Sequence, residues 1–188
     1  EWVTNKNHKE RKTLIIELNQ KILQETGSPI TAYSLRDLDD NNYNTTNIQL
    51  FDNGKDEQRD DSGEHVIMKY RTLRRREIEN YLIIPEAISR YIVSNCKNTG
   101  IPKDVNSVRD YLTNEHGLVI PETFKLSDRT SSTEGLFGKD VKPVFTEINS
   151  YFKVKWNKEE YIKSISSDEI CDDLVTIIDE IIEMCGTN

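Results

Sequence analysis

The spacing of hydrophobic residues changes from a helical to an extended period near the start of the chain. Residues 8–26 carry an apolar stripe with helical spacing, and Gly27 is a typical helix stop. After Pro29, residues 30–35 are mostly β-branched, aromatic or aliphatic, which is typical of a buried strand, and residues 65–70 predict a second strand. This order of elements indicates an α/β fold. We expect the two strands to be neighbours in one sheet that the first helix flanks.

Helical spacing returns from residue 85 onward. Apolar stripes predict five helices, at residues 85–96, 103–114, 139–151, 158–165 and 168–185. Pro143 lies in the first turn of the third, where proline is tolerated. Residues 41–64 indicate one long loop, and we expect 53–64 to be mobile because it has no aliphatic or aromatic residue. Residues 131–138, rich in Ser, Thr and Gly, predict a flexible linker.

Composition narrows the class of protein. The 188 residues are enough for one domain or one domain with an appendage. A net charge of −8 argues against a free-standing, non-specific nucleic-acid binder, but it is compatible with a nuclease that has an acidic metal site. Three widely spaced cysteines form no zinc pattern and are typical of a reduced compartment. With no apolar run of transmembrane length and no recognisable signal peptide, we predict a cytoplasmic protein without a membrane segment.

The first candidate site follows the predicted strand 30–35. Asp37 and Asp39 point to the same side of an extended chain, and Asp40 points to the other. Two carboxylates at the carboxyl end of a buried strand are suited to Mg²⁺ or Mn²⁺. A surface turn is the alternative, since Asp and Asn are also common in turns. The acidic cluster alone favours neither interpretation.

A second acidic pair, Glu77 and Glu79, lies beside apolar residues that indicate partial burial. A carboxylate in such surroundings needs a metal, an arginine or several hydrogen bonds. An ion pair with Arg74, Arg75 or Arg76 is the interpretation that the residues alone favour.

Two basic features could contact phosphate. Arg74, Arg75 and Arg76 form a short run whose planar guanidinium groups suit phosphate oxygens, and a solvated face is the alternative. Lys139 is expected to open a helix after Gly138, where backbone N–H groups attract anions. On that feature alone, an ordinary surface lysine is the better interpretation.

Together these motifs resemble a known family. The sequence Asp37-Leu38-Asp39-Asp40, the block Arg-Arg-Glu-Ile-Glu-Asn-Tyr-Leu-Ile at 75–83 and Gly138-Lys139-Asp140 resemble the TOPRIM domain of OLD (overcoming lysogenization defect) family nucleases, which serve in bacterial anti-phage defence. The resemblance covers about residues 10–150. It implies a Rossmann-like α/β TOPRIM sheet flanked by helices. It also implies metal-dependent DNA cleavage and an ABC-type ATPase domain elsewhere in the protein or complex.

The resemblance also implies roles for individual residues. Asp37 and Asp39 match the metal-binding Asp-x-Asp, Glu79 is the preferred further ligand with Glu77 in reserve, and Lys139 would stabilise charge on the phosphate. The intact protein is then expected to use two Mg²⁺ or Mn²⁺ ions about 3.5–4 Å apart. Its expected partners are DNA, the ATPase domain and further copies of itself, joined through other domains.

The chain also departs from the family pattern. The first acidic motif, a Glu-Gly after an apolar strand, is missing, so we expect that strand to be cut away, supplied by another chain or lost. We divide the chain into a TOPRIM-like α/β domain at 1–153 and a C-terminal helical appendage at 154–188. Two functions follow. One is a metal-dependent endonuclease, and the other is a degenerate TOPRIM-like module that binds a partner or nucleic acid without cutting.

Overall fold

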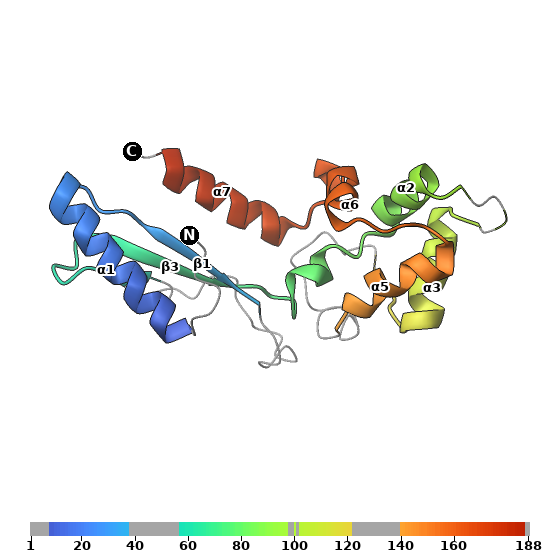
Figure 1. Cartoon of the computed structure of the whole chain (residues 1–188), viewed down its shortest axis with the longest axis horizontal. Coiled ribbons are helices and arrows are strands. Elements are labelled where there is room, and N and C mark those ends of the chain that lie inside the picture. The colour runs from blue at the N-terminus through green and yellow to red at the C-terminus, as the bar shows by residue number, and fades with distance from the viewer. Residues whose placement is uncertain (1–7, 38–56, 98–99, 101, 122–139, 187–188) are drawn as a thin grey trace. The chain divides into compact units, whose positions relative to one another are not determined.

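The computed structural model describes residues 8–37, 57–97, 100, 102–121 and 140–186, and these form two compact units. The first unit comprises Glu1–Arg36, Leu50–Thr72 and Ile181–Asn188, and the second comprises Asp37–Gln49 and Leu73–Glu180. The described residues contain six α-helices and a three-stranded mixed sheet, so this part of the chain is mixed α/β (Figure 1). None of the described helices is long and apolar enough to cross a membrane.

The sheet belongs to the first unit. Strand β1 (Ala32–Arg36) pairs in parallel with β3 (Val66–Thr72), and β2 (Glu57–Arg59) pairs antiparallel with the other edge of β3. Helix α1 (His8–Thr26) lies beside this sheet (Figure 1), with the Lys12 ammonium 5.7 Å from the centre of the Tyr70 ring. The prediction that the two strands are neighbours flanked by this helix is confirmed.

The prediction of one long loop at 41–64 is wrong for its last part. Residues 57–59 form β2, and a hydrogen-bonded turn joins β2 to β3. In this turn Asp60 Oδ1 accepts the Ser62 hydroxyl at 2.8 Å and the Glu64 N–H at 3.1 Å, and Gly63 has a positive φ of 75°. Asp, Ser and Gly are typical hairpin residues, so the composition that indicated mobility also encodes a tight turn. The preceding residues of the predicted loop, 41–56, lie outside the described residues.

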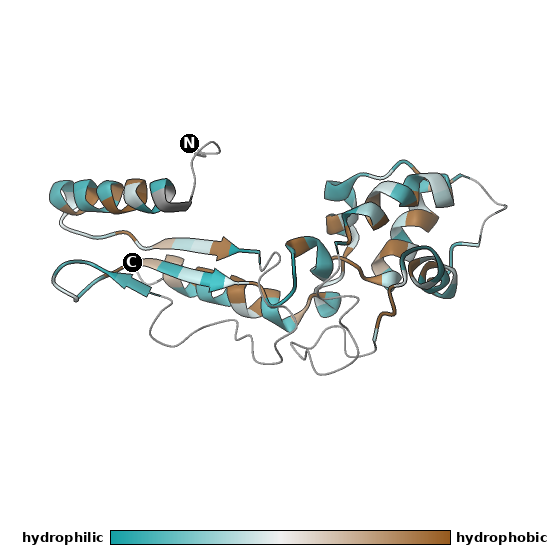
Figure 2. Cartoon of the chain, turned by 90° about the horizontal axis from the view of Figure 1, so that it is seen from below, coloured by the Kyte–Doolittle hydropathy of each residue, from teal (hydrophilic) through white to brown (hydrophobic). Residues whose placement is uncertain are grey.

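The second unit is helical. Its elements are η1 (Ile78–Tyr81), α2 (Pro85–Asn95), α3 (Val105–His116), α5 (Lys142–Phe152), α6 (Lys158–Ser164), η3 (Ser167–Glu169) and the start of α7 (Asp172–Gly186). Hydrophobic and hydrophilic stretches alternate along these helices (Figure 2), as amphipathic packing requires. The five predicted helices are confirmed, with three corrected starts. Helix α3 begins at Val105 instead of Lys103. Helix α5 begins at Lys142 instead of Lys139, and α7 begins at Asp172 because Ser167–Glu169 form a separate 3₁₀ turn.

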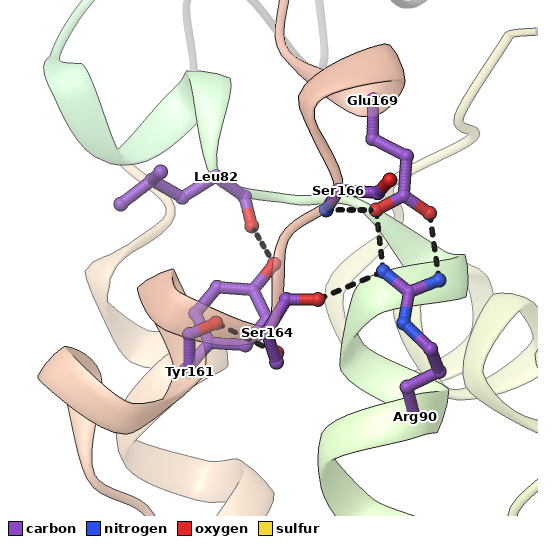
Figure 3. Close-up of polar contacts among 6 residues, drawn as sticks. All are labelled: Leu82, Arg90, Tyr161, Ser164, Ser166 and Glu169. Carbon is purple, nitrogen blue, oxygen red and sulfur yellow. Dashed lines mark hydrogen bonds and ion pairs between the residues drawn. The ribbon is translucent and has the colours of Figure 1, made fainter.

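One core joins these helices. It is built from residues of α2, α3 and α5, and it includes Val154 and Tyr161, which follow the predicted domain boundary at residue 153. Polar contacts connect α2 and the segment before it to α6 and η3 (Figure 3). The Tyr161 hydroxyl of α6 donates to the carbonyl of Leu82, which precedes α2, at 2.6 Å, and Arg90 of α2 donates to both Glu169 oxygens at 2.8 and 2.5 Å. The polypeptide around residues 73–82, which carries the candidate acidic pair, therefore leads directly into a well-packed core.

Candidate functional site

The acidic pair lies on a short 3₁₀ turn. Glu77 precedes η1 with an extended backbone, and its N–H donates to the Asn80 side-chain oxygen at 3.0 Å. The Asn80 N–H in turn donates to the Glu77 carbonyl at 3.1 Å. Glu79 lies within the turn, so the two carboxylates leave the backbone from an irregular segment, where the rules for helices and strands do not decide their direction.

Asp37 contacts the same turn. Its Oδ1 accepts the Ile78 N–H at 3.1 Å, across 41 positions of sequence. The N–H groups at the start of a helical turn have no partner within it, and a carboxylate satisfies one of them. The structure thus brings Asp37 to the segment between Glu77 and Glu79. Asp39, the other half of the predicted Asp-x-Asp, lies outside the described residues.

Glu77 is nearly buried and has only one of its two oxygens satisfied. Its side chain is 10% exposed, and Oε1 lies 3.0 Å from the Lys142 ammonium. Within the described part of the chain, Glu77 Oε2 is buried and has no hydrogen-bond partner. The hydrogen bond to Glu77 raises the pKa of Lys142 above its ordinary value, and the nearby charges of Glu77, Glu79 and Asp140 add to the effect. Lys142 is therefore charged at neutral pH.

Glu79 has a lysine partner of its own. Its Oε1 lies 2.8 Å from the ammonium of Lys158, at the start of α6, and its side chain is 16% exposed. Burial alone would raise the pKa of the Glu79 carboxyl, but the Lys158 hydrogen bond and the charges of Lys158 and Lys142 outweigh it and lower the pKa. Each glutamate thus has a lysine from a distant part of the chain as its counter-ion, where the sequence favoured the adjacent arginines.

The three arginines differ in their surroundings. Arg75 is 1% exposed. Its guanidinium donates to the Asn80 carbonyl at 3.1 Å and to Cys171 Sγ at 3.4 Å, and it lies 4.4 Å from the centre of the Tyr81 ring. Burial lowers its pKa from the ordinary arginine value. A guanidinium so enclosed packs the segment in place and has no access to a phosphate in solution, whereas Arg74 and Arg76 are half-buried.

Tyr81 and Asp173 hold residues 74–81 in place through hydrogen bonds. The Tyr81 hydroxyl donates to Asp173 Oδ2 at 2.9 Å and accepts the N–H groups of Arg74 at 3.1 Å and Arg75 at 3.3 Å. Arg74 also forms an ion pair with Asp173, at 3.7 Å. No local signal in the sequence marks Asp173 or Cys171 as partners, because more than 90 positions separate them from Tyr81 and Arg75.

Lys139 lies outside the described residues. The position predicted for it, the first residue of the helix, is occupied by Lys142. This shift of three positions places a different lysine beside the acidic pair. Lys142 was not singled out from the sequence, because nothing in its local sequence marks it as a partner of the acidic pair.

The described residues do not by themselves complete a metal centre. Among them, no group of three or more His, Cys, Asp or Glu side chains is arranged to hold a metal ion. Asp37, Glu77 and Glu79 supply the kind of oxygen atoms that Mg²⁺ and Mn²⁺ prefer. The arrangement is a set of carboxylates around one turn, each of the two glutamates with a lysine as counter-ion.

Comparisons with models of known protein families, with curated proteins and with solved structures found no match to this chain. The functional argument therefore rests on the residues and their geometry.

Proposed function

We propose that the chain is the nuclease part of an OLD-like ATPase–nuclease, a TOPRIM-type domain that hydrolyses phosphodiester bonds of DNA with Mg²⁺ or Mn²⁺. The observation that carries the proposal is the hydrogen bond between the Ile78 N–H and Asp37 Oδ1, because it joins the two acidic motifs that the family resemblance selects. Asp37 also follows the carboxyl end of β1, and ligand sites of open α/β sheets lie at that end. The parallel pairing of β1 with β3 is compatible with a Rossmann-like TOPRIM sheet, which is part of the proposal.

Glu77 Oε2 supports the fit of a cation. A buried carboxylate oxygen without a hydrogen-bond donor is unfavourable unless a cation compensates it. The residues that would hold the metal are Asp37, Asp39, Glu77 and Glu79. A bound divalent ion supplies an activated water and neutralises charge on the phosphate.

The chain's own residues orient the carboxylates and add positive charge. The Ile78 N–H fixes Asp37, and burial fixes Glu77. The lysines beside the glutamates supply charge near an anionic phosphate. Lys139 keeps its proposed role in stabilising the phosphate. DNA, an ABC-type ATPase domain, assembly through other domains, a cytoplasmic location and anti-phage defence complete the proposal, and they rest on the family resemblance.

The proposal is tested by Mn²⁺ binding and by nicking of supercoiled plasmid. We expect Asp37→Ala and Glu77→Gln each to weaken Mn²⁺ binding at least about tenfold, because a metal site loses that much even when a supporting residue is removed. Both changes should abolish nicking. Asp110→Asn is the matched control, since Asp110 is an exposed acid on α3, a different element from the turn that carries the acidic pair. Both assays use the intact protein. If it binds no Mn²⁺, or if Asp37→Ala and Asp110→Asn bind Mn²⁺ equally well, the proposal is contradicted.

The second candidate function is a TOPRIM-like module that binds nucleic acid or a protein without cutting. The specific observation in its favour is that Lys142 and Lys158 already neutralise Glu77 and Glu79, as a site without metal requires. This module would bind its partner equally well with and without divalent cations. Mn²⁺ binding without any nicking by the intact protein would favour it over the nuclease.

A further inference from the structure

The ion pair between Lys142 and Glu77 is asymmetric. The Glu77 side chain is 10% exposed, so its carboxylate is fixed by its surroundings, whereas the Lys142 side chain is 58% exposed. Lysine has a flexible stem with four carbons, and here that stem lies mostly in water. The pair can therefore separate by movement of the lysine alone, while the glutamate stays where it is.

The charges around Glu77 decide when the lysine leaves. Without metal, the ammonium at 3.0 Å compensates the buried carboxylate. A divalent cation on Glu77 supplies this compensation itself and repels the ammonium at close range. The backbone of Lys142 remains fixed at the first turn of α5, where its N–H donates to Asp140 Oδ1 at 2.9 Å. The displaced ammonium therefore stays within the length of one side chain of the metal.

We propose that Lys142 exchanges partners, binding Glu77 in the metal-free protein and a phosphate oxygen of the DNA once a divalent cation occupies Glu77. This inference rests on the proposed function, because it requires a cation at Glu77. It makes Lys142 a substrate-binding residue of the site. It also gives the two lysine–glutamate pairs a purpose in a nuclease, since the lysines occupy the carboxylates until the metal arrives.

The exchange predicts an effect of Lys142→Met that depends on metal. DNA binding is measured by fluorescence anisotropy of a labelled 20-base-pair duplex, at 4 °C to limit hydrolysis, with and without Mn²⁺. One phosphate contact increases the DNA affinity by a factor of about eight at 0.1 M salt. It also adds about 0.9 to the magnitude of the slope of log affinity against log salt concentration. With Mn²⁺, Lys142→Met should bind DNA about eightfold more weakly than the wild type at 0.1 M salt, and its salt slope should be smaller by about 0.9. Without Mn²⁺ it should bind DNA as the wild type does.

Two control variants and one further measurement make the result specific. Lys155→Met removes an exposed positive charge that belongs to neither lysine–glutamate pair, and we expect the same small loss of DNA affinity with and without Mn²⁺. Lys142→Arg keeps the charge and should retain most of the affinity. Lys142→Met should also bind Mn²⁺ more tightly than the wild type, because the competing ammonium is gone.

The possible outcomes separate this inference from the proposed function. If the wild type binds no Mn²⁺, the proposed function fails and the exchange fails with it. If Mn²⁺ binds and Glu77→Gln prevents it, yet Lys142→Met loses no more DNA affinity than Lys155→Met, only the exchange is overturned. Equal losses by Lys142→Met with and without Mn²⁺ overturn it as well, because they indicate a permanent phosphate contact.

Discussion

Replacing Tyr81 with phenylalanine removes one oxygen atom that makes three hydrogen bonds in a buried site. The hydroxyl donates to Asp173 and accepts two backbone N–H groups, from Arg74 and Arg75. Tyr81 is 1% exposed and Asp173 is 2% exposed, so water does not replace the lost bonds. The ring remains, and with it the packing and the contact with the Arg75 guanidinium at 4.4 Å.

The size of the effect follows from the kinds of bond that are lost. A hydrogen bond to a charged group contributes about 1.5–3 kcal/mol, and each bond to a neutral N–H contributes about 1 kcal/mol. The free energy of unfolding should therefore fall by about 3–5 kcal/mol. Since the total for a domain is about 5–15 kcal/mol, this loss is a large part of the stability. At a typical urea dependence, it lowers the midpoint of unfolding by roughly 2 M.

Tyr161→Phe is the matched control. Tyr161 is also fully buried, but its hydroxyl donates to a neutral group, the Leu82 carbonyl, instead of a carboxylate, so we expect a smaller loss of about 1 kcal/mol. Both variants are compared with the wild type by urea denaturation followed by circular dichroism. Equal losses in the two variants would refute the reasoning. A double-mutant cycle with Asp173→Asn should give a coupling of at least about 1 kcal/mol to Tyr81.

Two further predictions concern other parts of the helical unit. Arg90→Met should lower the free energy of unfolding by about 1 kcal/mol, because the pair with Glu169 is bidentate but Arg90 is half exposed. The hydrogen bond from Arg90 lowers the pKa of Glu169, so the pair stabilises fully above the ordinary carboxyl value of 4.5 and is lost as pH falls through the lowered pKa. Urea denaturation at pH 7 and at pH 2.5 should then show a difference between wild type and Glu169→Gln that shrinks in acid. Gly117→Ala should lower the free energy of unfolding by about 1 kcal/mol in the same assay at pH 7, because residue 117 caps α3 with φ of 63°. Gly186→Ala is the control and should leave the free energy of unfolding unchanged, because an added Cβ there meets nothing within 4 Å.

Much of the fold could be predicted because its signals are local. The stripe of α3 is closed by Asp104, whose side chain accepts the Ser107 N–H at 3.0 Å, and by Gly117 in the left-handed conformation. Proline in the first turn of α2 and of α5 is likewise a local signal. The pairing of β1 with β3 followed from two apolar segments in an α/β pattern. Strand β2 escaped prediction, because three polar residues carry no strand period and only the hairpin turn after them indicates pairing.

The candidate site was only partly predictable, because its partners are distant in sequence. Asp37, Glu77 and Glu79 were selected from local motifs, and the structure places Asp37 against the turn that carries the other two. The lysine partners could not be predicted, since Lys142 and Lys158 are far along the chain and nothing local marks them. A run of three arginines also gives no indication that the middle one is buried, because its guanidinium contacts Cys171, which directly precedes α7 and is 96 positions away.

The segment from Arg74 to Tyr81 joins stability and chemistry in eight consecutive residues. Its 3₁₀ turn is only four residues long, and hydrogen bonds in such turns have poor geometry, so the turn does not hold its own shape. The shape is held by Arg75, which donates to Cys171 just before α7, and by Tyr81, which donates to Asp173 in the first turn of α7. Glu77 and Glu79 leave the same turn toward the lysines. The positions of the acidic groups therefore depend on residues of α7 that would never touch a metal or a substrate, and Asp173 belongs to the support of the site as much as to the fold.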